Sequence, residues 1–110
     1  MTTTLDTDPR IVEVTTDSTG TWSVTFAAAM TAVGAASISS CAATLYRSSP
    51  LTAKEEVTGF VVSAVVNGTS VEVTWTGSVL AQRNRYQLET RATFNVGGTK
   101  EFLTEVYAVA

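Results

Sequence analysis

Few residues of this sequence could carry out covalent or acid–base chemistry. The chain contains no histidine, which removes the commonest general base and the commonest metal ligand. Its single cysteine, Cys41, lies among small apolar residues of a β-rich run, which predicts a buried small hydrophobe rather than a reactive thiol. No serine lies in a nucleophile-elbow motif, and no histidine could activate one. We therefore expect no catalytic residue and no enzymatic activity.

The carboxylates do not form a recognisable metal site either. A calcium loop supplies about six to eight oxygen ligands, and the spacing of Asp6, Asp8 and Asp17 does not fit one. Glu55-Glu56 follows Lys54, which predicts an exposed charge cluster rather than a pair of catalytic carboxylates. We expect neither a metal nor a cofactor.

Composition narrows the class of protein. The chain has 110 residues, of which 45% are hydrophobic and 15% charged, and this is enough apolar content for one domain with a real core. The net charge is −3 and the seven Lys and Arg residues are scattered, so we expect no nucleic-acid partner. No apolar run approaches the roughly 18–20 residues of a membrane span, so we expect no membrane partner.

Cysteine usage and the first residues bear on where the chain folds. One cysteine cannot form an intramolecular disulfide. Residues 1–9 contain neither the basic nor the apolar segment of a signal peptide. Together these features predict synthesis and folding in a reducing cytoplasm.

The elements that would position any functional side chain are strands. The clearest pattern is the closing segment Arg85–Val109, in which apolar and polar residues alternate up to Phe94, as in a half-buried antiparallel strand. Gly97-Gly98 supplies the positive φ angles of a reversal, so Thr99–Val109 returns along the first run. A hairpin is therefore expected to close the domain.

The rest of the chain follows the same rhythm. Seven strands are expected at Arg10–Thr15, Thr21–Ala27, Ser37–Arg47, Val57–Val66, Thr69–Thr76, Arg85–Phe94 and Thr99–Val109. Asn67-Gly68 predicts a type I′ turn with positive φ at both residues. The segment Ala28–Ala36 is ambiguous: its alanine-rich composition suits a helical turn, but Gly34 and its shortness favour a loop. One helical turn is expected at Val79–Ala81. The count and spacing predict an all-β, two-sheet antiparallel sandwich formed by residues 10–110.

The closing segment resembles the F–G hairpin of immunoglobulin-like domains. In that family a tyrosine near the start of strand F forms the tyrosine corner, and Tyr86 matches this role. The family usually has a glycine just before this tyrosine, where Asn84-Arg85 stands here. The cysteine pair and the tryptophan that packs against it in antibody domains are absent. The resemblance implies an immunoglobulin-like β-sandwich of about seven strands.

More narrowly, the chain is similar to small immunoglobulin-like structural proteins of tailed bacteriophages. Cys41–Arg47, the Asn67-Gly68 hairpin and Arg85–Val109 carry this likeness. Several such proteins decorate or cement the capsid, and others belong to tails or fibres. The resemblance implies a virion protein without identifying its position in the virion. The leading hypothesis is a decoration protein on the capsid surface, bound to the major capsid protein or another virion protein. A tail or head–tail connector subunit, and a module that binds host glycans or proteins, remain open alternatives.

A partner-binding surface is expected at both ends of the chain. In the last strand Leu103, Tyr107 and Val109 fall on the opposite side from Phe102 and Val106. A half-buried strand does not need so many apolar residues on its second side, so we expect this side to contact a partner or another copy. The first nine residues are expected to form a flexible arm, either a loose terminus or a segment that docks on a partner through Leu5 and Pro9. Trp22 and Trp75 are expected to pack in the core.

Overall fold

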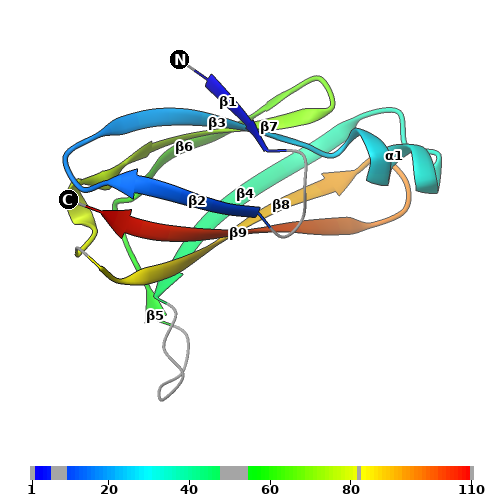
Figure 1. Cartoon of the computed structure of the whole chain (residues 1–110). Coiled ribbons are helices and arrows are strands. Elements are labelled where there is room, and N and C mark those ends of the chain that lie inside the picture. The colour runs from blue at the N-terminus through cyan, green and yellow to red at the C-terminus, as the bar shows by residue number, and fades with distance from the viewer. Residues whose placement is uncertain (1, 6–9, 48–54, 82, 110) are drawn as a thin grey trace.

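The chain folds into two packed β-sheets and one short helix (Figure 1). The computed structural model describes residues 2–5, 10–47, 55–81 and 83–109. In chain order the elements are β1 (Thr2–Leu5), β2 (Arg10–Thr15), β3 (Thr19–Thr25), α1 (Ala27–Val33), β4 (Ile38–Arg47), β5 (Glu55–Glu56), β6 (Val61–Asn67), β7 (Ser70–Thr76), the 3₁₀ turn η1 (Gly77–Val79), β8 (Arg85–Phe94) and β9 (Thr99–Val109).

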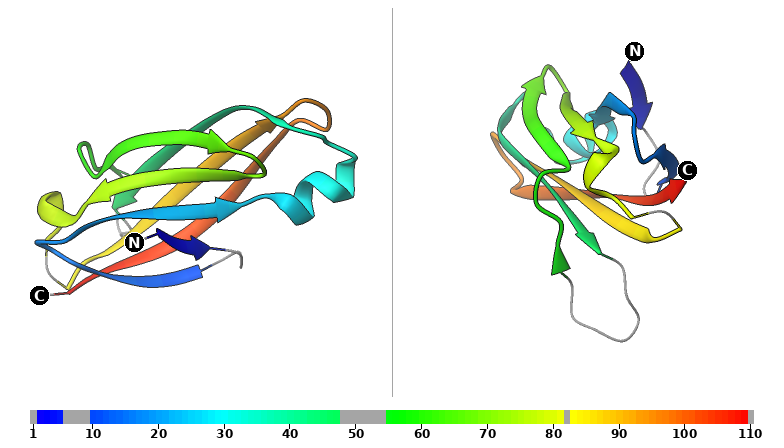
Figure 2. Two further views of the ribbon diagram at one scale, coloured as in Figure 1. Left: turned by 90° about the horizontal axis from the view of Figure 1, so that it is seen from above. Right: turned by 90° about the vertical axis from the view of Figure 1, so that its left-hand side faces the viewer.

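The sheets stack as the two layers of a sandwich (Figure 2). The larger sheet has the strand order β2-β9-β8-β4-β5, and the smaller has the order β1-β3-β7-β6. The β8–β9 hairpin lies at the middle of the larger sheet. Neighbouring strands are antiparallel, except that β2 runs parallel to β9 and β1 runs parallel to β3. The predicted two-sheet sandwich is confirmed, while the expectation of antiparallel pairing is wrong for β2; β1 lies within residues 1–9, where no strand was predicted.

The core lies between the sheets because apolar side chains alternate along each strand. In β7, for example, Val71, Val73 and Trp75 are buried while the residues between them are half-exposed. The ring of Trp75 stacks on Phe60, with centroids 5.6 Å apart and planes 10° apart, and lies 4.9 Å from the ring of Trp22. The prediction that both tryptophans pack in the core is confirmed.

The segment after β3 is a helix, so the favoured prediction of a loop was wrong and the helical alternative is the one that forms. α1 is short, and its buried Met30 anchors it against the core. Gly34 does not break the helix but ends it: its φ of +72° is left-handed, and the N–H of Ala35 then donates to the carbonyl of Met30 over 2.8 Å. None of the helices in the described part of the chain is long and apolar enough to span a membrane.

The β6–β7 hairpin forms where it was expected, but its turn is shifted by one residue. Asn67 pairs with Ser70, so the two loop residues are Gly68 and Thr69. Only Gly68, with a φ of +63°, is left-handed. Positive φ at the first loop position alone is typical of a type II′ turn, so the type I′ prediction was wrong. The side chain of Asn67 instead donates from Nδ2 to Glu72 Oε1 over 2.7 Å.

Several element boundaries differ from the prediction, and β3, for example, spans Thr19–Thr25 rather than Thr21–Ala27. The run predicted from Val57 becomes a strand only at Val61, and β5 forms at Glu55–Glu56, where a connection was expected. The helical turn predicted at Val79–Ala81 is a 3₁₀ turn that begins two residues earlier, at Gly77. The closing hairpin has the predicted bounds, and both Gly97 and Gly98 have positive φ.

Two hydroxyl groups in the core have no hydrogen-bond partner in the described part of the chain. Thr90 on β8 and Thr104 on β9 are fully buried, and their Oγ1 atoms are unpaired. Because an unpaired buried hydroxyl costs free energy, we expect Thr90→Val to raise the free energy of unfolding by about 1 kcal/mol. Urea unfolding would measure this change. Thr21→Val on the outer side of β3 is the control and should not stabilise the protein, because its half-buried hydroxyl already has a partner in Thr74 Oγ1 at 3.4 Å; a loss of stability in Thr90→Val would contradict the prediction.

Candidate partner-binding face

The side of the larger sheet that points away from the core carries the predicted partner-binding residues of β9. Phe102, Thr104, Val106 and Ala108 are buried, so the alternate residues of this strand point outward. Leu103, Tyr107 and Val109 are among these outward residues, and all three are half-buried. We call the outward side of β2, β8 and β9 the outer face. The structure therefore brings three of the five predicted contact residues together on one surface.

Tyr107 lies at the centre of a charged cluster on the outer face. It is directly opposite Glu13 on β2 and Arg85 on β8, and Glu105 precedes it by two residues on its own strand. Arg85 Nη1 lies 3.4 Å from Glu105 Oε1, and its Cζ lies 5.9 Å from the centroid of the Tyr107 ring. These four side chains line a shallow hollow of about 320 Å³. We call them the Tyr107 cluster.

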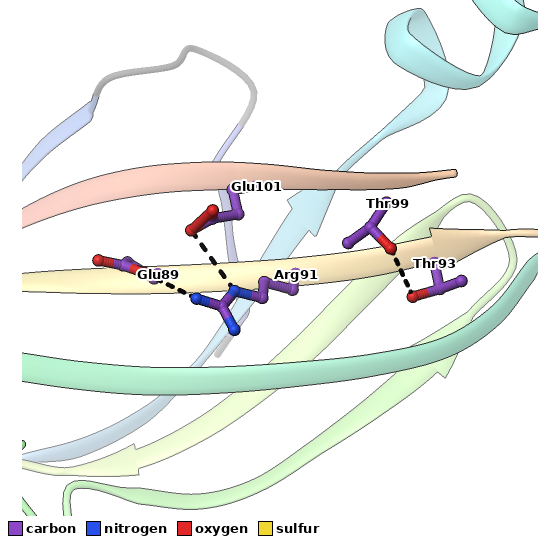
Figure 3. Close-up of polar contacts among 5 residues, drawn as sticks. All are labelled: Glu89, Arg91, Thr93, Thr99 and Glu101. Carbon is purple, nitrogen blue, oxygen red and sulfur yellow. Dashed lines mark hydrogen bonds and ion pairs between the residues drawn. The ribbon is translucent and has the colours of Figure 1, made fainter. Parts of the chain in front are cut away.

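A second charged group lies further along the same face and is held more firmly (Figure 3). Arg91 Nη2 is 3.3 Å from Glu89 Oε1, and Arg91 Nε is 3.5 Å from Glu101 Oε1. The charge of Glu101 and its hydrogen bond raise the pKa of Arg91, and the charge of Glu89 adds to this effect. The side chain of Glu89 is only 5% exposed, although it points away from the core. One guanidinium thus bridges carboxylates from two neighbouring strands and orders this part of the face.

The two groups differ in how strongly they are constrained. In the Tyr107 cluster the side chains of Arg85 and Glu105 are 67% and 41% exposed, and one long contact joins them. Glu13 is exposed, and within the described residues its carboxylate has no hydrogen-bond or ion-pair partner. An exposed pair of this kind contributes little to stability, so its side chains can rearrange at small cost. The Tyr107 cluster is therefore the part of the outer face whose side chains can rearrange most easily.

The other predicted contact residues are less well defined. Leu5 is the last residue of β1 and is paired in register with Val24, while Pro9 lies outside the described residues. The prediction of a flexible arm over residues 1–9 therefore stays a prediction, although Thr2–Leu5 forms a strand beside β3. The structural residue Tyr86 is fully buried, and its hydroxyl accepts a hydrogen bond from the N–H of Ala81 over 2.9 Å.

Sequence reasoning missed the charged members of the outer face. Glu13 and Arg85 are 72 positions apart in the sequence and meet only because β2 and β8 both pair with β9. Their outward positions follow from the two-residue period of each strand, but no local signal indicates that these strands share a neighbour. Exposed valines on β6 were also missed: Val62 is 64% exposed and Val65 is 53% exposed.

A larger hollow of about 520 Å³ opens beside α1. Its lining is mainly apolar and includes Phe26, Phe102 and the first residues of the helix, with Lys100 as the one charged group. This hollow supplies apolar surface and a single ammonium group. It contains no acid–base pair. Within the part of the chain that the structure describes, no three His, Cys, Asp or Glu side chains converge as metal ligands would.

Cys41 has the environment of a weakly reactive thiol. Its Sγ donates to the carbonyl of Ala64 over 3.5 Å, and burial raises the pKa of the thiol above its ordinary value. Because the thiolate is the nucleophile, alkylation by iodoacetamide should accelerate only at a higher pH than in the denatured chain. The folded protein also holds the thiol proton more tightly than the unfolded chain. The free energy of unfolding is therefore highest below the unfolded-state pKa of Cys41 and falls as the pH rises through the folded-state pKa. Equal pH profiles for the folded and denatured protein would contradict this prediction.

The sequence was compared with protein-family models and with curated proteins. No family model and no curated protein matches the chain.

Proposed function

We propose that this protein is a non-enzymatic structural protein of a bacteriophage virion that decorates the capsid and stabilises the shell by binding the major capsid protein. The observation that carries the proposal is the outer face, where half-buried Leu103, Tyr107 and Val109 lie among ionic side chains on an open sheet. Protein interfaces combine an apolar, often tyrosine-rich centre with a polar rim, and this face has that composition. The phage-specific part of the proposal rests on the resemblance of Cys41–Arg47 and the two hairpins.

We further propose that the sandwich is of the immunoglobulin-like type. Two observations support this assignment. The orders β1-β3-β7-β6 and β2-β9-β8-β4-β5 follow the arrangement in which strands A, B, E and D form one sheet, and strands G, F and C the other. The hydrogen bond from the N–H of Ala81 to the Tyr86 hydroxyl, near the start of β8, matches a tyrosine corner. The parallel pairing of β1 with β3 does not support this assignment, which rests on the strand orders and the tyrosine.

Two other roles involve binding as well. A tail or head–tail connector subunit would use the same face to form a ring rather than scattered surface copies. A host-adhesion module that binds glycans would need aromatic platforms in its loops. The segments 16–20, 48–56 and 95–98, which the sequence predicts as connections, contain no aromatic residue, and this favours the decoration role over glycan binding.

Co-sedimentation with capsids that lack this protein tests the proposal. We expect saturable binding at many sites per shell and a higher temperature of shell disruption, because a ligand that binds only the assembled state stabilises it by mass action. Capsids mixed with heat-denatured protein provide the control. If the folded protein does not bind shells, the decoration role is wrong, and binding to purified tails would then support the connector role.

A further inference from the structure

The charges of the outer face are unbalanced. Among the described outward side chains of β2, β8 and β9, the carboxylates outnumber the guanidinium groups by four to two. The carboxylates belong to Glu13, Glu89, Glu101 and Glu105, and the guanidinium groups to Arg85 and Arg91. Arg91 is already bridged to two of the carboxylates. Each group therefore carries one excess negative charge, but the two differ in pairing: Arg91 contacts both of its carboxylates, whereas Arg85 contacts Glu105 alone and leaves Glu13 without a partner among the described residues.

The Tyr107 cluster has the geometry to receive a cationic side chain. Glu13 lies to one side of Tyr107 across the sheet, and Glu105 lies two residues before it along β9. The aromatic ring already faces a guanidinium, that of Arg85, at 5.9 Å. A second cation on this surface would meet two carboxylates and a π face, which together favour Arg or Lys by charge and by cation–π attraction.

We propose that the outer face docks on a partner protein surface that carries an excess of Arg and Lys, and that one cationic side chain of the partner occupies the Tyr107 cluster between Glu13 and Glu105. Leu103 and Val109, on the same strand, supply the apolar contacts beside it. This inference rests on the proposed function, and it specifies the chemistry of the surface that the protein would bind. Charge complementarity favours such a partner over a second copy, because two copies face to face would bring together two surfaces of the same negative sign.

Arg85 has an unexpected role in this arrangement. In the free protein its guanidinium contacts the Glu105 carboxylate and lies over the Tyr107 ring, so it competes with the incoming cation for both groups. Its exposed, single contact is weak enough for a partner to displace it. Removing Arg85 should therefore strengthen the binding of a cationic partner, whereas removing either carboxylate should weaken it.

The test uses the isotope-labelled full chain and a capped peptide, Gly-Ser-Arg-Leu-Arg-Ser-Gly, with its Glu-for-Arg counterpart as a negative probe. Amide chemical shifts report where each peptide binds. We expect the Arg peptide to perturb residues around Glu13, Glu105 and Tyr107, with binding that weakens as sodium chloride is added. The counterpart peptide should not bind. Shifts spread evenly over both sheets would overturn the proposal.

Variants give the quantitative comparison. E13Q and E105Q should each weaken Arg-peptide binding about two- to fivefold, the range of one exposed charge contact, because the Tyr107 ring stays in place. E72Q removes the same charge from the outer side of the smaller sheet and should have no effect. R85Q should tighten binding about threefold, whereas R47Q, with the same change in net charge, should not. If E13Q and E72Q have equal effects, or R85Q and R47Q do, the net charge of the protein alone explains the peptide binding. Either result would overturn the proposal.

The same variants separate this inference from the proposed function. If wild-type protein binds capsids and E13Q binds them equally well, the decoration role stands and the inference about the Tyr107 cluster fails. If the peptide binds at the Tyr107 cluster but the protein does not sediment with capsids, the inference stands and the decoration role fails.

Discussion

Replacing Gly77 by alanine should lower the free energy of unfolding by about 2–4 kcal/mol, because a side chain at this position has no space. Gly77 begins η1 and is buried under the β2–β3 turn, where its N–H donates to the carbonyl of Ser18 over 2.8 Å. A Cβ at Gly77 would lie 2.5 Å from the carbonyl oxygen of Thr15 and 3.1 Å from a methyl group of Val14. The first contact is to backbone, so relieving it requires the turn to move.

The matched control is Gly98→Ala in the closing hairpin. Gly98 has a φ of +85° and open space where a Cβ would be, so alanine there costs only the left-handed backbone conformation, about 1–2 kcal/mol. Urea unfolding of both variants measures the difference. If Gly77→Ala is no less stable than Gly98→Ala, the close packing of η1 against the β2–β3 turn does not require a glycine at position 77, and the prediction is wrong.

Truncating Trp75 to alanine should lower the free energy of unfolding by about 3–5 kcal/mol, the usual cost of removing a buried large aromatic side chain. Trp75 contacts the rings of both Trp22 and Phe60, and it also lies against the backbone of Gly20. A Cβ on Gly20 would lie 2.7 Å from Cζ2 of Trp75. The small size of Gly20 therefore makes room for this indole between the sheets.

This contact predicts a coupling that a double-mutant cycle can measure. Gly20→Ala alone should cost about 1–3 kcal/mol through overpacking, because the indole is held by two other rings. In the Trp75→Ala background the same substitution should cost much less, since the clashing ring is gone. Additive effects of the two substitutions would show that Gly20 is needed for its backbone conformation rather than for the space it leaves.

Much of the fold could be predicted because its signals are local. The alternation in Arg85–Phe94 and the Gly97-Gly98 pair depend on neighbouring residues only, and the hairpin forms with the predicted bounds. Two of the errors arose at glycines that serve a different purpose from the predicted one. Gly34 ends a helix rather than preventing it, and Gly68 supplies the first rather than the second loop position of its turn.

The sequence by itself determined which residues of each strand point together, because side chains alternate every two residues whatever lies beside the strand. For this reason Leu103, Tyr107 and Val109 could be predicted to share a side. Only the tertiary structure decided which strands are neighbours, because sheet pairing joins segments far apart in the chain and has no local code. The parallel pairing of β2 with β9 places Glu13 beside Tyr107, and the antiparallel pairing of β8 places Arg85 on its other side. The apolar residues of the candidate face could therefore be predicted from the sequence, whereas its charged cluster could not, because that cluster forms only when the strands pair.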